Sequence, residues 1–241
     1  MLIGSKPADI RMGNRMLAAL PDDELRRLMP YLQEIKLSSG QVIYEQSTPI
    51  IYAYFPVDSI ISALHVMSDG SSIEVNLVGQ EGVTGISALL GAAETFNEWI
   101  AQVPGTAFRI DIQRLHDEFN RSGRLQRFLL LYTHALIKHM SQSVACNRLH
   151  HIEQRLCRWL LTIHDRVERD DLRITHEFVA RMLGVRRAGV TEALGLLQCA
   201  GMISLARGQV TVLDREGLEA AACECYQLVK EEFDNLYGER R

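Results

Sequence analysis

Two adjacent arginines, Arg186 and Arg187, open a predicted helix directly after a turn at Gly184. An arginine guanidinium can donate two parallel hydrogen bonds to a base edge or to a phosphate. At the exposed N-terminal end of a helix, such side chains meet base edges and phosphates in the major groove of DNA. These residue types at this spacing therefore predict contact with double-stranded DNA.

The segment from Thr175 to Leu197 places the two arginines on a pair of short helices joined by a turn. Gly184 can adopt the left-handed conformation that a tight turn demands, and Thr175 can cap the first helix. Ala180 is small enough for a close helix crossing, and the apolar side chains recur at helical spacing: Val179, Leu183, Val190, Leu194 and Leu197. This pattern is typical of a helix-turn-helix.

The composition limits where such a motif can act. The 241 residues suffice for one large or two modest domains, and the apolar fraction of 47% is ordinary for a globular chain. The net charge of -4 confines a DNA-binding surface to a local patch. No apolar run approaches the roughly 20 residues of a membrane span, and the segment MLIGSKPADIRMG lacks a signal-peptide core. We expect no membrane contact and a cytoplasmic location, which suits the five scattered cysteines.

The first half of the chain predicts two short helices and then a β domain. Residues 12–35 read as two helices divided at Pro21, with Asp22 as the cap of the second. Six runs rich in Val, Ile, Tyr and Phe then alternate with glycine-containing turns, at residues 41–45, 50–57, 59–67, 71–78, 99–103 and 106–112. They predict a small antiparallel barrel or sandwich, with a hairpin from His65 to Val75.

A long helix is predicted from Arg124 to Leu149, after a shorter helix at residues 112–119. At 1.5 Å per residue it spans roughly 40 Å, more than a domain core requires. Seven of its residues recur at alternating spacings of four and three, as in a two-stranded coiled coil: Leu125, Leu129, Tyr132, Leu136, His139, Ser143 and Cys146. We expect the first six to form a homodimer interface; the alternative is an amphipathic helix packed within a monomer.

The last third of the chain predicts a winged domain. Residues 152–167 form an amphipathic helix that precedes the helix-turn-helix. Residues 202–214 predict a hairpin with its turn at Arg207 and Gly208, where a wing would lie. Residues 214–237 are predicted to close the chain as one helix.

Cysteine and histidine residues offer other chemistries. We expect no catalysis, since the cysteines lie among apolar neighbours on predicted helices and the chain has no glycine-rich phosphate loop. Zinc binding by Cys223 and Cys225 with histidines lacks a matching second pair, so we expect reduced thiols packed against the wing. Oxidation of Cys146, or of the Cys223 and Cys225 pair, stays open as a redox switch because reactivity depends on a pKa that sequence does not give.

The order of barrel, long helix and winged helix-turn-helix resembles the Crp/Fnr superfamily of bacterial transcription regulators, that of the catabolite activator protein and FNR. The resemblance covers nearly the whole chain and is most specific at residues 174–203 and 78–91. It implies an α+β fold with a cyclic-nucleotide-binding-like jelly-roll barrel in residues 1–121. A dimerisation helix in residues 122–149 and a winged helix-turn-helix domain in residues 150–241 would follow. It also implies a homodimer that binds a palindromic operator.

The sensor part departs from the cyclic-nucleotide binders of this family. Those proteins carry a glutamate after the short-helix glycine and an arginine that holds the cyclic phosphate. In this chain Gly85 is followed by Ile86, and Phe96, Asn97 and Glu98 stand where the arginine segment would lie. A phosphate buried beside Glu98 would be opposed by charge repulsion and by desolvation. We therefore expect no control by cyclic AMP.

Two other family cofactors are disfavoured as well. No cysteine precedes Cys146, unlike the cysteines near the N-terminus that hold an iron–sulfur cluster in FNR-like proteins, and His65 is the only histidine of the barrel segment that a haem could use. We predict no cofactor and leave a small-molecule effector unidentified. The candidate effector pocket consists of Gly85, Ile86, Leu89, Leu90 and Asn97.

Alignment with the family assigns roles to the DNA-facing residues. Arg187 occupies the position that reads a guanine, where a bidentate contact discriminates by about 1–3 kcal/mol. The chain has Ala188 and Glu192 where the family often has a glutamate and an arginine, so we expect a different operator. Glu192 is a candidate base contact to cytosine N4, or an ion-pair partner of Arg187 or of a neighbouring residue, and both interpretations stay open. The candidate phosphate contacts are Thr175, Arg186, Thr191 and Arg207.

The combined prediction is a sequence-specific DNA-binding transcription regulator that acts as a homodimer and not as an enzyme. RNA polymerase is a further partner if the protein activates transcription. Two alternatives remain: a thiol-based redox-responsive regulator, and a small-molecule-binding module without DNA-binding output. The arginines that open the second helix argue against the latter.

Overall fold

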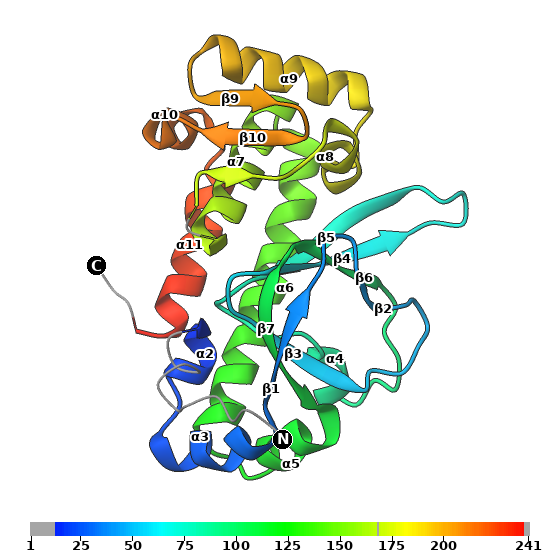
Figure 1. Cartoon of the computed structure of the whole chain (residues 1–241), viewed down its shortest axis with the longest axis vertical. Helices are drawn as coiled ribbons and strands as arrows, with labels where there is room; N and C mark the ends of the chain where they lie inside the picture. The colour runs from blue at the N-terminus through cyan, green and yellow to red at the C-terminus, as the bar shows by residue number, and fades with distance from the viewer. Residues whose placement is uncertain (1–12, 168, 239–241) are drawn as a thin grey trace. The chain divides into compact units, whose positions relative to one another are not determined.

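The computed structural model describes residues 13–167 and 169–238 (Figure 1). Their contacts divide the chain into two compact units, of which the first comprises Met1–Ala63, Leu77–Leu136 and Phe233–Arg241 as far as they are described. The second comprises Leu64–Asn76 and Ile137–Glu232. The predicted His65 to Val75 hairpin therefore groups with the winged domain and not with the barrel.

Two antiparallel sheets form the β-roll. One has the order β1, β7, β3 and the other the order β2, β6, β4, β5. The strand bounds are β1 Gln33–Leu37, β2 Val42–Tyr44, β3 Tyr52–Pro56, β4 Ile60–Val66, β5 Ser72–Val78, β6 Glu98–Val103 and β7 Gly105–Asp111. All six predicted runs are strands, and the β4 to β5 hairpin turns where Met67 N–H donates to the Ser71 carbonyl at 2.8 Å. Apolar residues such as Ala53, Phe55, Ile60 and Ile61 are fully buried and form its core.

The segment before the β-roll differs from its prediction. Helices α2 (Arg15–Ala18) and α3 (Asp22–Leu28) are separated at Pro21 as expected, but α3 ends early and a 3-10 turn at Met29–Tyr31 follows. Pro30 lies in that turn, since its ring and missing N–H do not suit a continuing α-helix. Residues 33–37 then pair with β7 instead of continuing the helix to Ile35. The expected Asp22 cap is also wrong, because Pro21 is the N-cap and no side chain caps this helix.

The long helix α6 runs from Arg124 to Leu149, as predicted, after α4 (Ile86–Leu89) and α5 (Ile112–Phe119). Its first backbone N–H groups have no partner within the helix. The Glu24 carboxylate of α3 accepts from the Arg124 N–H at 2.7 Å and from the Leu125 N–H at 2.8 Å. A buried acid from α3, about a hundred residues earlier in the chain, thus fixes where α6 begins.

The second unit contains the winged helix-turn-helix. Figure 1 shows the hairpin of β9 and β10 beside α9, as a wing should lie. Its sheet has the order β8, β10, β9, and β8 was not predicted. The bounds are α7 Ile152–Val167, β8 Asp171–Leu172, α8 His176–Leu183, α9 Arg187–Cys199, β9 Ile203–Ala206, β10 Gln209–Val212, α10 Arg215–Ala221 and α11 Cys225–Leu236.

The predicted single closing helix is two helices. Ala222 has φ -72° and ψ 156°, an extended conformation that interrupts the chain between α10 and α11. The break places Cys223 and Glu224 in a turn between the two helices. None of the helices in the described ranges combines the length and the apolar character that crossing a membrane requires.

Candidate nucleic-acid interface

The helix-turn-helix forms where its sequence predicts it. The Thr175 hydroxyl accepts from the Phe178 N–H at 3.2 Å and caps α8, and Gly184 ends that helix with φ +62°. The positive φ favours glycine at this position, and a Cβ there would lie 2.6 Å from Ile73 Cδ1, so the Ile73 side chain would have to move. The predicted core residues Val179, Ala180, Leu183, Val190, Leu194 and Leu197 are all buried.

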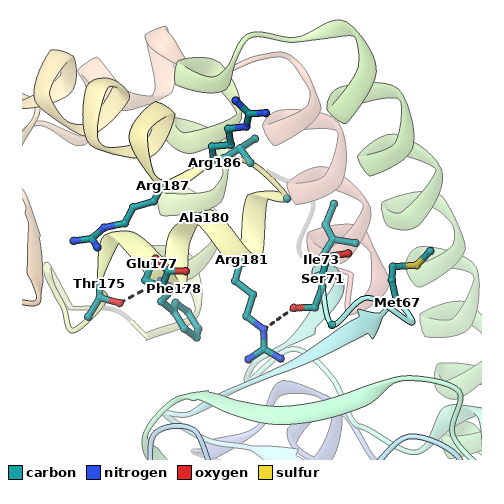
Figure 2. A pocket seen from close by; sticks show the side chains of 14 residues that line it. Met67, Ser71, Ile73, Thr175, Glu177, Phe178, Ala180, Arg181, Arg186 and Arg187 are labelled. Atoms are coloured by element: carbon teal, nitrogen blue, oxygen red, sulfur yellow. Dashed lines mark hydrogen bonds between the residues drawn. The ribbon is translucent and has the colours of Figure 1, made fainter.

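Both arginines at the start of α9 are exposed. Arg186 is the N-cap with extended backbone, and Arg187 is the first residue of the helix. Figure 2 shows their side chains extending in different directions from this point. One helix start therefore presents two guanidinium groups to two neighbouring regions of a ligand.

The wing adds a third arginine. Arg207 is exposed at the turn between β9 and β10. Together with Thr175 and Arg187 it borders a surface hollow of about 470 Å³ that His176 and Gln209 also line. Three of the predicted contact residues thus come together around one concavity. His176 and Gln209 were not predicted. The one signal for them in the sequence is that they lie next to, or two residues from, the predicted contacts Thr175 and Arg207.

The other predicted contact residues lie further along α9. Glu192 is exposed. Thr191 is exposed as well, but its hydroxyl lies 3.0 Å from His176 Nδ1 and donates to the Arg187 carbonyl at 3.1 Å. Thr191 therefore already makes bonds within the protein, which a phosphate would have to share or replace.

The turn region of the helix-turn-helix contacts the β4 to β5 hairpin (Figure 2). Arg181 Nε donates to Ser72 Oγ at 2.6 Å, and Trp159 Nε1 donates to Glu74 at 3.2 Å. Met67, Ile73 and the start of α9 line a second surface hollow of about 1210 Å³ here. These contacts are why the hairpin groups with the winged domain.

The predicted dimer seam requires a correction. Ser143 is half-buried. The other five residues are buried within the chain: Leu125, Leu129, Tyr132, Leu136 and His139. The Tyr132 ring, for example, packs against the Phe233 ring with centroids 6.0 Å apart. In this conformation these side chains are not available to a second subunit. The spacing correctly identifies an apolar stripe, but that stripe faces the chain's own core.

A different apolar stripe of α6 is exposed. Leu130, Ile137, Met140 and Val144 lie seven, three and four residues apart and are each more than a third exposed. This is the spacing of the a and d positions of a coiled coil. The sequence prediction missed these residues because they sit beside the stronger buried stripe.

The five candidate effector residues do not share one environment. Gly85, Leu89 and Asn97 are buried and Ile86 is half-buried, whereas Leu90 is 57% exposed. The space beside Gly85 is bounded by Ile112, Ala53 and Ile50, whose atoms would lie 3.4–3.5 Å from a Cβ there. Apolar side chains of the protein thus already contact the position next to the short helix.

Known proteins share both the domain and the fold. Residues 154–221 match the Crp-like helix-turn-helix domain. The chain is 24% identical over 208 residues to the global nitrogen regulator of Synechocystis sp., covering 83% of this chain and 92% of that protein. The same regulator of Synechococcus elongatus is 24% identical over 193 residues, covering 76% and 86%.

Solved structures show the same architecture. FixK2 from Bradyrhizobium japonicum matches with a TM-score of 0.68 at 16% identity, covering 80% of this chain and 98% of that one. The c-di-GMP-responsive global regulator CLP of Xanthomonas campestris matches with a TM-score of 0.65 at 14% identity, covering 80% and 99%. The chain therefore contains a Crp-like helix-turn-helix domain in residues 154–221 and has the fold of β-roll, long helix and wing that these regulators share.

Proposed function

We propose that this regulator binds a palindromic operator as a homodimer, with Arg187 reading a base and Arg186 and Arg207 contacting phosphates. The observation that carries the proposal is the position of Arg187 and Arg207 on one hollow at the exposed start of α9. Guanidinium groups there can bond a guanine edge and the adjacent backbone at once. Glu192, exposed on the same helix, is available to a cytosine N4.

The proposed dimer uses the exposed stripe of α6. Ile137 and Val144 are 55% and 72% exposed, which is costly for large apolar side chains in water. Pairing this stripe with that of a second copy would bury both around a two-fold axis. Two winged domains related by that axis would then face two inverted half-sites.

We further propose that cyclic AMP does not control this protein. The position after the short-helix glycine is Ile86, whose side chain offers no polar atom to a ribose. Phe96 is 66% exposed and Asn97 is buried, with its backbone N–H bonded to Thr95 Oγ1 at 3.3 Å. Glu98 then begins β6 with a carboxylate where the family has a cationic segment. A cyclic phosphate in this region would meet a negative charge.

Selection of binding sites from a random DNA pool tests the proposal as a whole. We expect enrichment of an inverted repeat that contains a guanine in each half-site, bound by two chains per duplex as measured by mass. Enrichment of a single asymmetric site, or of no sequence at all, would contradict it. The selection needs no added cyclic AMP if the last part of the proposal holds.

A further inference from the structure

Four side chains that bind metals well meet in the second unit. Cys146 lies near the end of α6 and His150 directly follows that helix, whereas Cys223 lies in the turn between α10 and α11 and Cys225 is the first residue of α11. Their donor atoms all lie within 4.8 Å of one another. We propose that these three thiolates and one imidazole bind a single zinc ion.

The distances suit one tetrahedral ion. Zinc bonds of about 2.3 Å to sulfur and about 2.0–2.1 Å to nitrogen place two ligand sulfurs about 3.8 Å apart, and a sulfur and a nitrogen about 3.5 Å apart. Cys146 Sγ lies 3.5 Å from Cys223 Sγ, and Cys225 Sγ lies 3.5 Å from His150 Nδ1. The widest separation in the group has to contract by only about 1 Å to reach tetrahedral geometry.

The backbone explains how the four residues come together. Cys146 and His150 are four residues apart, and His150 N–H donates to the Cys146 carbonyl at 3.1 Å, so both side chains share one face of the helix. The extended Ala222 interrupts the last two helices, and Tyr226 N–H donates to the Cys223 carbonyl at 3.0 Å to close the turn. This helix break turns the Cys-Glu-Cys segment toward α6.

Neighbouring side chains orient the ligands as in known metal sites. His150 Nε2 lies 3.3 Å from a Glu224 carboxylate oxygen, which leaves Nδ1 to face the cysteines. A carboxylate bonded to the second ring nitrogen fixes the tautomer of a metal-binding histidine. Gln142, one turn before Cys146, donates from Nε2 to Cys225 Sγ at 3.0 Å. A side-chain amide thus supports one of the sulfur ligands.

The electrostatic surroundings favour an anionic centre. Zinc with three thiolates and a neutral imidazole carries one net negative charge, and burying it requires compensation. Arg155 and Arg158 are buried on α7, with Nε atoms that lack hydrogen-bond partners, and their charges act on Cys146.

A structural role follows from the ligand count. Four protein ligands fill a tetrahedral site and leave no open position for a substrate. The three cysteines are at most 3% exposed, whereas the His150 side chain is 17% exposed and gives the ion a way in. The ion would fasten the turn between α10 and α11 to the end of α6 within the second unit.

Metal content of the full-length protein, with any affinity tag removed, tests the proposal directly. After incubation with zinc chloride and gel filtration, we expect one zinc per chain by mass spectrometry. Cobalt(II) in place of zinc is expected to give the intense visible bands of tetrahedral cobalt and a thiolate-to-cobalt charge-transfer band. A metal-free protein with free thiols, a Cys146 to Cys223 disulfide, or iron with sulfide would each overturn the proposal.

Variants identify the ligands. Cys223→Ser should lose the zinc, whereas Cys199→Ser, at an exposed cysteine on α9, should keep one zinc per chain. Glu224→Gln should keep all four ligands but bind zinc about 10–100-fold more weakly. If Cys223→Ser does not fold, the wild-type protein still decides the question. A chelator must lower its melting temperature and added zinc must restore it; no response to either would contradict the site.

Discussion

The Thr191 hydroxyl lies 3.0 Å from His176 Nδ1 and so joins the recognition helix α9 to the first residue of α8. The same hydroxyl donates to the Arg187 carbonyl at 3.1 Å. These two bonds hold Thr191 within the helix-turn-helix, directly behind the arginine proposed to read a base. We therefore expect Thr191 to position the DNA-binding surface; its contact with a phosphate stays a prediction.

Thr191→Val tests this positioning role. The substitution keeps the side-chain shape but removes both hydrogen bonds, so the free energy of unfolding should fall by about 1 kcal/mol. Affinity should fall by a similar factor for every DNA sequence, because a loosened helix affects all sites alike. Denaturant unfolding and binding to a panel of operator variants check both points. A change of preference between operators would instead show that Thr191 reads sequence.

His139 predicts a loss of stability in mild acid. Burial, and to a smaller extent the charges of Arg166 and Arg158, lower the pKa of this imidazole from 6.5 to about 3. Below pH 6.5 the unfolded chain gains a proton at His139 that the folded chain does not. The free energy of unfolding therefore decreases as the pH is lowered. At pH 5.5 it is about 1.4 kcal/mol smaller than at high pH.

The measurement compares denaturant unfolding of wild type and His139→Gln at pH 7.5 and 5.5. The variant should lose less stability between the two pH values than wild type does. Glu74 and His139 line one small cavity, and Glu74 is unchanged in the variant. His116→Gln, at a half-buried histidine of α5, should behave like wild type. Equal pH dependence in all three proteins would show that His139 is protonated without cost.

The exposed stripe of α6 predicts how the dimer is broken. Ile137→Glu should place a carboxylate in each half of the interface and weaken the dimer by about 3–5 kcal/mol, which is a hundredfold or more in Kd. Sedimentation velocity should then show monomers at concentrations where wild type is dimeric. Leu213→Glu changes an equally exposed aliphatic residue, 61% exposed, outside α6 and should leave the dimer intact. A dimeric Ile137→Glu would exclude this stripe as the interface.

Titration calorimetry tests the independence from cyclic AMP. With Ile86 at the ribose position and Glu98 near the phosphate position, we expect no binding heat at micromolar cyclic AMP. A cyclic-AMP-dependent family member measured in parallel serves as the control. Micromolar binding at the β-roll would contradict this part of the proposal.

The sequence predicts elements well where local signals are strong. The bounds of α6 and α7, the glycine turn at Gly184 and the wing turn at Arg207 all agree with the structure. Each depends on periodicity or on a turn residue with a defined conformation. Strand β1 was missed because Gln33–Leu37 has no apolar run and is a strand only through its pairing with β7.

Long-range relationships are not visible in local periodicity. The stripe that begins at Leu125 reads as a coiled-coil seam, but the chain buries it against its own side chains. Likewise Cys223 and Cys225 lacked a second ligand pair in sequence, because Cys146 and His150 lie more than seventy residues away along the chain. Only the helix break at Ala222 brings the four side chains together.

Operator discrimination by Arg187→Ala tests the central claim most directly. Arg187 lies at the exposed start of α9 and borders the same hollow as Arg207. We predict that the variant stays folded and dimeric but loses about 1–3 kcal/mol of discrimination at one guanine in each half-site. Arg186→Ala, the matched control, should weaken binding to all sequences alike and reduce the salt dependence by about one phosphate contact. Unchanged sequence preference in Arg187→Ala would contradict the claim that this residue reads the operator.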